Sequence, residues 1–156
     1  MKIGIGCDHA AFFEKQKLIK YIVSEFNYEV IDFGTKSENS VDYAEFGHAV
    51  GNAIKNSTIN RGIVICGSGI GISIAANKIK GVRAALCTSV KHAEMSRKHN
   101  DANILALGAR FTSYDEIKKI VKKWFQTDFE GGRHLRRVNK IEKNWKDNNE
   151  RRYKII

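Results

Sequence analysis

Short apolar runs alternate along the chain with longer segments in which apolar residues recur every three or four positions. The short runs are rich in Ile, Val, Leu and Ala and are nearly continuous, a pattern typical of parallel strands that are buried on both faces. This pattern predicts five strands, at residues 2–7, 29–33, 62–66, 82–87 and 103–107.

The longer segments have the period of amphipathic helices. They predict helices at residues 12–26, 43–55, 70–78, 90–99, 114–125 and about 133–149. Ser113 and Glu116 form a capping box at the start of the fifth helix. In the last helix, Val138, Ile141 and Trp145 would form the apolar stripe.

Strands that alternate with helices predict a Rossmann-like three-layer α/β sandwich, in which a five-stranded parallel sheet has helices on both faces. The chain has no proline, and we find no repeat or low-complexity linker that would mark a domain boundary. We therefore expect one domain over residues 1–156, in which residues 133–156 are a basic C-terminal helix and tail.

Composition narrows the class of protein. With 42% hydrophobic residues the chain can bury a core, which excludes wholesale disorder. The uncharged stretch at residues 62–77 contains Ser and Asn between Arg61 and Lys78, so we expect no membrane span. The first eight residues lack the pattern of a signal peptide, which favours a cytoplasmic location.

The positive charge is concentrated near the end of the chain. The formal net charge is +10, and residues 133–156 contain nine Lys and Arg but three Asp and Glu. Such a segment suits nucleic acid, a solvated helix or a phosphorylated small molecule. Few aromatic residues are interleaved with the basic ones and no recognition motif is present, so we expect no nucleic-acid partner.

The three cysteines are widely spaced and odd in number. Neither a zinc knuckle nor a disulfide framework fits this spacing, and we expect Cys7 and Cys87 to be buried thiols. No group of His, Asp and Glu has the spacing of a ligand set, so we expect neither a metal nor another cofactor.

In open parallel sheets, ligands bind beyond the carboxyl ends of the strands. The first strand ends at Asp8 and His9, the third ends at Cys66 and a glycine-rich loop, and the fifth is followed by Arg110. The fourth is followed by Thr88 and Ser89. Reactive groups are therefore expected along one edge of the sheet.

Glycines at positions 67, 69 and 71 make up the loop after Cys66. The loop is neither a dinucleotide fingerprint, because position 72 is Ile, nor a P-loop, and a plain tight turn is the simplest alternative. Its N–H groups could hold an anion, and an adjacent helix start would favour the thiolate of Cys66. This combination suits acyl transfer through a thioester or proton abstraction beside a carbonyl through an enediolate.

Basic residues help to choose between these two chemistries. His99 and Asn100 could complete a cysteine-protease set with Cys66. However, Arg110, Arg133 and Arg137 indicate an anionic ligand and favour a sugar phosphate.

Four motifs occur in order over nearly the whole chain: residues 6–10 (GCDHA), 66–78 (CGSGIGISIAANK), 97–103 (RKHNDAN) and 130–137 (EGGRHLRR). With these motifs the chain resembles the type B ribose-5-phosphate isomerases of the ribose/galactose phosphate isomerase family. The resemblance implies interconversion of ribose 5-phosphate and ribulose 5-phosphate in the non-oxidative pentose phosphate pathway, without a metal. It also implies a homodimer or a pair of dimers, with each site built by two subunits.

The resemblance implies roles for individual residues. Cys66 resembles the base that moves a proton between C1 and C2, and His99 resembles the group that opens the sugar ring. The loop that holds the enediolate would comprise Gly67, Ser68, Gly69, Ile70 and Gly71. Sugar contacts would come from Asp8, His9, Tyr43 and Asn100, and phosphate contacts from Arg110, Arg133 and Arg137, with His134 assisting.

Simpler roles stay open for some of these residues. Asp8 could only cap the following helix, and His9 could only belong to a capped turn. His99 could be a cation at a helix C-terminus, and Arg133 and Arg137 could be solvated.

The sequence departs from the family pattern at a few positions. Ala11 and Ala44 stand where the family often has Gly and Pro, and Ser68 replaces a common Thr. A related branch uses a carboxylate where this chain has Ile72, so the sequence is of the cysteine type.

Other functions compete with this one. Galactose-6-phosphate or allose-6-phosphate isomerase is the nearest alternative, although the galactose enzyme divides its site between two different subunits. A module that binds anions or nucleic acid is the alternative from a different class.

Overall fold

The computed structural model describes residues 1–143 of the chain. Within them the five predicted strands form one sheet in the order β2-β1-β3-β5-β4, and every neighbouring pair is parallel. The strands are β1 (Lys2–Cys7), β2 (Glu29–Asp32), β3 (Arg61–Cys66), β4 (Ala84–Leu86) and β5 (Ile104–Gly108). The predicted parallel sheet is confirmed.

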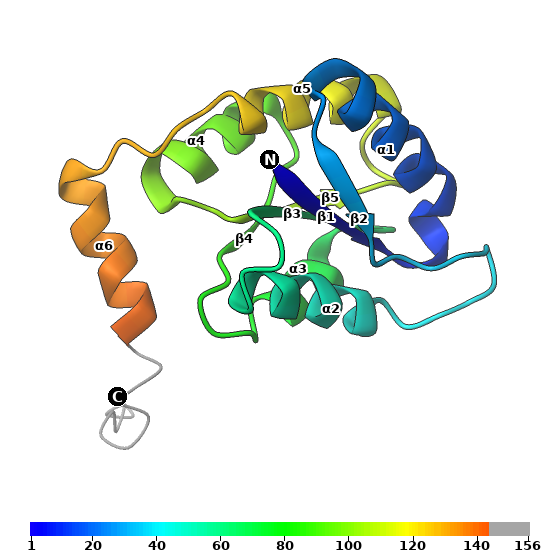
Figure 1. The fold of residues 1–156 in the computed structure, drawn as a ribbon, viewed down its shortest axis with the longest axis horizontal. Coiled ribbons are helices and arrows are strands. Elements are labelled where there is room, and N and C mark those ends of the chain that lie inside the picture. Colours follow the sequence, from blue (N-terminus) through cyan, green and yellow to red (C-terminus); the bar gives the residue numbers. More distant parts are fainter. Residues whose placement is uncertain (144–156) are drawn as a thin grey trace, which may run out of the picture.

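Helices cover both faces of this sheet (Figure 1). On one face lie α1 (Phe12–Phe26), α4 (Val90–Asn100) and α5 (Tyr114–Phe125), and on the other lie α2 (Tyr43–Lys55) and α3 (Ile70–Ala76). A short 3₁₀ turn, η1 (His9–Ala11), precedes α1, and α6 (Gly132–Lys143) stands beside α4, away from the sheet. The predicted three-layer sandwich is confirmed.

Alternate side chains of each central strand supply two separate cores. Ile63 and Ile65 of β3 point to the core under α1, α4 and α5, whereas Val64 and Cys66 point to the core under α2 and α3. All four side chains are buried, as expected for a strand that is covered on both faces. This double burial fixes the position of the strand end that carries Cys66.

Several predicted boundaries differ from the structure. The fourth strand is confined to residues 84–86, because it lies at the edge of the sheet and pairs only with β5. The helix predicted at 70–78 ends at Ala76, where the Asn77 side chain bonds the backbone of Ala84 and turns the chain. The Ser113 cap is confirmed, since its hydroxyl accepts the N–H of Glu116 at 3.3 Å.

The last helix agrees only partly with its prediction. It is described as Gly132–Lys143, and the rest of the predicted segment, including Trp145, lies outside the described residues. Val138 is buried as expected, but Ile141 is about half exposed. Among residues 1–143, no helix combines the length and the apolar character needed to cross a membrane.

A buried lysine holds the segment that follows β2. Lys15 of α1 is 2% exposed, and its Nζ donates to Asp32 Oδ2 at 2.8 Å and to the Thr35 carbonyl at 2.7 Å. Both acceptors lie at the start of the connection between β2 and α2. Lys15 therefore ties this connection to α1 and fixes the course of the chain toward Tyr43, the first residue of α2.

Candidate active site

Most of the predicted site residues meet at the carboxyl edge of the sheet. Cys66, the last residue of β3, pairs with Gly108 at the end of β5, and its carbonyl accepts the N–H of Ala109 at 2.9 Å. The next carbonyl, that of Gly67, accepts the N–H of Arg110 at 3.0 Å. Backbone bonds thus hold the glycine loop against the segment that carries Arg110.

The thiol of Cys66 lies inside the turn made by this loop. The Gly69 N–H donates to Cys66 Sγ at 3.1 Å, and the Ile70 N–H donates to Ser68 Oγ at 3.2 Å. These two donors are therefore engaged within the loop. The N–H bond from Gly69 holds the Cys66 sulfur in one position within the loop.

Glycine is required at two positions of the loop for different reasons. Gly69 has a φ of +76°, and a Cβ there would lie 2.7 Å from the backbone carbon of Leu107. At Gly71 a Cβ would lie 2.5 Å from Cζ of the Tyr43 ring. The loop can therefore pack closely against β5 on one side, and Tyr43 can lie directly over it on the other.

Asp8 and His9 follow β1 at the same edge. Asp8 is 6% exposed and accepts the N–H of Ala10 at 3.0 Å, so its capping role is confirmed. Burial raises the pKa of the Asp8 carboxyl above its ordinary value, although the Ala10 N–H and the charges of His9 and Arg110 oppose this shift. The Val41 N–H donates to Nδ1 of His9 at 3.2 Å and orients the ring.

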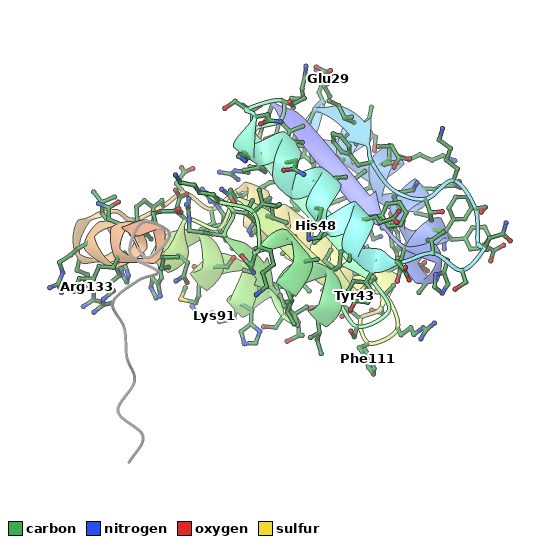
Figure 2. All side chains as sticks on the ribbon, turned by 90° about the horizontal axis from the view of Figure 1, so that it is seen from below. Glu29, Tyr43, His48, Lys91, Phe111 and Arg133 are labelled. Carbon is green, nitrogen blue, oxygen red and sulfur yellow. The ribbon has the colours of Figure 1, made fainter. Side chains whose placement is uncertain are left out.

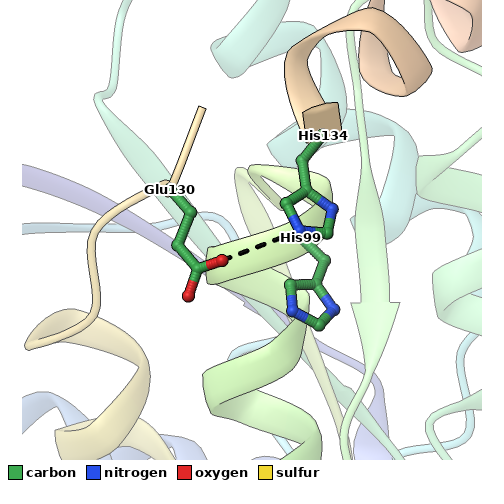
Figure 3. Close-up of side chains that lie close together, drawn as sticks. All are labelled: His99, Glu130 and His134. Atoms are coloured by element: carbon green, nitrogen blue, oxygen red, sulfur yellow. Dashed lines mark ion pairs between the residues drawn. The ribbon is translucent and has the colours of Figure 1, made fainter. Parts of the chain in front are cut away.

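A second group of predicted residues surrounds the end of α4. The ring of His99 stacks on that of His134 from α6, with centroids 4.2 Å apart and an interplanar angle of 6°. Figure 3 shows this pair with Glu130, whose Oε2 lies 3.6 Å from Nε2 of His134. Arg133 Nε donates to the same nitrogen at 3.5 Å. This cluster joins residues from two predicted motifs.

Burial and neighbouring positive groups act in the same direction on the pKa of His134. That ring is 5% exposed, and burial lowers its pKa, with His99, Arg133 and Arg137 acting in the same direction. Glu130 opposes the shift. The stacked ring of His134 restricts the orientation of the His99 ring.

The same cluster contains three residue types that bind metals. One possible ligand atom from each of His99, Glu130 and His134 lies within 4.8 Å of the others. Imidazole binds a metal in the plane of its ring, and the two rings are nearly parallel, so their lone pairs do not converge on one point. The arrangement is that of a stack beside a carboxylate, not that of a preformed metal centre.

The group around Cys66 and the group around His99 lie at opposite ends of the parallel strands. The chain passes from His99 through Ala102 into the first residue of β5, whereas Cys66 pairs with the last residue of that strand. Four steps along a strand span about 13 Å. In Figure 2, Tyr43 lies far from Arg133. One chain therefore does not bring Cys66 together with His99, nor Arg110 together with Arg133 and Arg137.

Some functional candidates have other roles or escaped the sequence analysis. Ser89 caps α4 by accepting the N–H of His92, and Thr88 bonds the His92 ring. Glu130 lies in the last motif, but no spacing rule indicates that it faces His134. Arg83 bonds the end of α4 and was not singled out, because its partners are distant in sequence.

These features define an α/β protein with a parallel sheet in which a cysteine at a strand end lies beside a glycine loop. The profile of the family described as Ribose/Galactose Isomerase matches residues 3–141. The chain belongs to this family.

Individual relatives narrow the comparison. The chain is 44% identical over 140 residues to ribose-5-phosphate isomerase B of Escherichia coli. The aligned region covers 90% of this chain and 93% of the relative. The structure of the Clostridium thermocellum ribose-5-phosphate isomerase B matches with a TM-score of 0.91 and 53% identity, over 94% of this chain and 98% of that one. The Mycoplasma genitalium enzyme, solved with bound ribulose 5-phosphate, matches with a TM-score of 0.88 and 39% identity, over 94% and 97% of the two chains.

We predict that the three thiols differ in their rate of alkylation. All three are buried and unpaired, but burial raises the pKa of Cys7 to about 12 and that of Cys87 to about 11, so both stay protonated at pH 8. Cys66 ends its strand beside the loop and receives an N–H bond. Iodoacetamide at pH 8 should therefore modify Cys66 first, as measured by peptide mass spectrometry.

A Cys66→Ala variant is the control for this experiment and should take up no label over the same time. Labelling of Cys7 or Cys87 before Cys66 would contradict the assignment of the reactive thiol.

Proposed function

We propose that the chain is an aldose–ketose isomerase that interconverts ribose 5-phosphate and ribulose 5-phosphate through an enediolate. Its relatives carry the name of this enzyme over nine-tenths or more of both chains. The observation that carries the chemistry is the thiol of Cys66 held in the glycine loop by the Gly69 N–H. A base at that position is what proton transfer between adjacent carbons requires.

Cys66 acts as this base. Its thiolate removes the proton from C2 of the open-chain aldose, and the electron pair moves to O1, which forms the enediolate. The proton then returns to C1, while one proton passes from O2 to O1, so the product is the ketose and no net charge changes. Gly67–Gly71 and the Ser68 hydroxyl surround the enediolate and stabilise its charge.

His99 performs the earlier step, the opening of the furanose ring. Histidine suits this step because it exchanges a proton near neutral pH. Asn100 lies next to His99 and contacts the sugar, as do Asp8, His9 and Tyr43 from the carboxyl edge. Arg110, Arg133 and Arg137 bind the phosphate, assisted by His134.

A second copy of the chain completes each site. Within one chain, Cys66 and His99 lie at opposite ends of the parallel strands. They are too far apart to act on neighbouring atoms of one sugar. In a two-fold homodimer, the carboxyl edge of one subunit meets the α4 end of its partner, and the symmetry creates two equal sites. The exposed side chains of Ile70 and Ile74, each 54% exposed on α3 beside the loop, support such an apolar contact.

The setting of the reaction follows from the substrate. We place the enzyme in the cytoplasm, in the non-oxidative pentose phosphate pathway, where these two sugar phosphates are exchanged. The relatives do not favour galactose-6-phosphate isomerase, and one chain supplies both halves of the site, so no second kind of subunit is required.

The direct test is an isomerase assay with ribose 5-phosphate after treatment with a chelator. We expect full activity, because the proposed steps use a thiol, an imidazole and backbone donors. Ribulose 5-phosphate is measured as product. An untreated sample is the control, and loss of activity that a divalent ion restores would contradict the mechanism.

We further predict that Cys66 and His99 act on different steps. His99→Asn should slow the conversion of ribose 5-phosphate but not that of an analogue that lacks the 4-hydroxyl, since such a sugar cannot close a furanose ring. Cys66→Ala should lower kcat about 100-fold or more on both substrates, as expected for loss of a general base.

Steady-state kinetics on the two substrates make this comparison. Near-normal turnover by Cys66→Ala would show that another group is the base. Equal impairment of both substrates by His99→Asn would make His99 an orienting residue.

A further inference from the structure

Helix α6 joins the rest of the chain through two glycines. Gly131 and Gly132 have φ values of 65° and 51°, and nothing lies within 4 Å of the position that a Cβ would take at either one. A left-handed joint without packed neighbours sets the direction of the following helix only weakly. The Glu130 N–H, just before this joint, donates to the Lys98 carbonyl at 3.1 Å and holds the start of α6 beside α4. Contacts further along the helix therefore help to fix its direction.

Arg83, which precedes β4, holds the end of α4. Its Nε donates to the carbonyls of Asn100 and Asp101, both at 3.1 Å, and its Nη2 donates to the Asp101 carbonyl at 2.9 Å. These are the last carbonyls of α4 and its cap, which have no partner within the helix. Arg83 thus fixes the backbone directly after His99.

The same guanidinium also holds the far end of α6. Its Nη1 donates to Oε1 of Glu142 at 2.6 Å, and the side chains of Arg83 and Glu142 are 17% and 32% exposed. Glu142 lies ten residues after Gly132, which corresponds to about 15 Å along a helix. One side chain therefore links the α4 terminus to the end of α6 that is remote from the glycine joint.

One of the two proposed phosphate-binding arginines of α6, Arg137, lies between these two attachments, and the other, Arg133, lies next to the first of them. The His99–His134 stack holds α6 close to the glycine joint, and the Arg83–Glu142 pair holds it near its other end. Arg133, directly before His134, and Arg137, three residues after it, are both exposed. Together with the buried side chain of Val138, these two separated attachments define the axis of the helix.

We propose that Arg83 and Glu142 form a latch that positions the phosphate-binding helix relative to His99 and Asn100. This inference rests on the proposed function, in which Arg133 and Arg137 bind the phosphate of the substrate. Neither latch residue is among the proposed substrate contacts, so both are positioning residues. Since the latch organises the helix before the substrate arrives, binding does not have to order it.

The latch should affect substrate binding more than the chemical step. The phosphate of the substrate is remote from C1 and C2. The proposed base, Cys66, lies at the opposite end of the parallel strands from the latch. We expect Glu142→Gln to raise the KM for ribose 5-phosphate about fivefold, the size that corresponds to a partly exposed ion pair, and to leave kcat within about twofold.

Binding of inorganic phosphate, measured by calorimetry, should weaken by a similar factor. This second readout needs no turnover. If the unmodified protein does not isomerise ribose 5-phosphate, the proposed function fails, and the phosphate affinity still decides whether the latch exists.

Glu29→Gln is the matched control. It removes the same charge from an ion pair with Lys2, at 3.3 Å, and Figure 2 shows Glu29 and Arg133 in different parts of the molecule. This variant should leave KM, kcat and phosphate affinity unchanged.

A double-mutant comparison tests whether the two residues act together. Arg83→Lys keeps the charge but loses the planar fork, so Glu142→Gln should raise KM less in that background than in the unmodified chain. The proposal would be overturned if the effects of the two substitutions on KM were additive. It would also be overturned if Glu142→Gln left KM and phosphate affinity unchanged, or lowered kcat alone. Loss of the cooperative unfolding transition in Glu142→Gln would also overturn it, because the pair would then support global stability.

Discussion

The parallel pairing of β3 with β5 is the constraint on which the rest of the site depends. Gly62 pairs with Ile104 at one edge of the sheet, and Cys66 pairs with Gly108 at the other. Because α4 must return to the start of β5, its last residues lie at the edge opposite Cys66. The direction of the strands therefore separates the thiol from His99 and leaves each chain with two separate groups of candidate residues, which under the proposed function are the two halves of a shared site.

The two halves are held by different kinds of interaction. The carboxyl-edge half depends on backbone geometry, since strand pairing, the positive φ of Gly69 and an N–H bond fix the thiol. The other half depends on side chains, namely the stack of His99 on His134 and the bonds of Arg83. Under the proposed function, the proton-transfer group is thus rigid from the outset, whereas the phosphate-binding helix has to be positioned by a few specific contacts.

The sequence predicts the sheet well because a strand buried on both faces leaves a continuous apolar run, and the ends of such runs place Asp8, Cys66 and Arg110 at one edge. It predicts the edge strand less well, since β4 has one neighbour and its pattern extends beyond its pairing. The stack of His99 on His134 and the bonds of Arg83 are not predictable from spacing, because they join elements that are far apart in sequence. The separation of Cys66 from His99 follows from the strand order and direction, which the motifs alone do not contain.

Complementation between two impaired variants tests the shared site most directly. Cys66→Ala and His99→Asn chains are mixed, unfolded and refolded together, and assayed with ribose 5-phosphate. A mixed dimer contains one site with both functional residues and one with neither. Random pairing should therefore restore about a quarter of the activity of the unmodified protein. Activity no higher than the mean of the two variants refolded separately would contradict a site built from two chains.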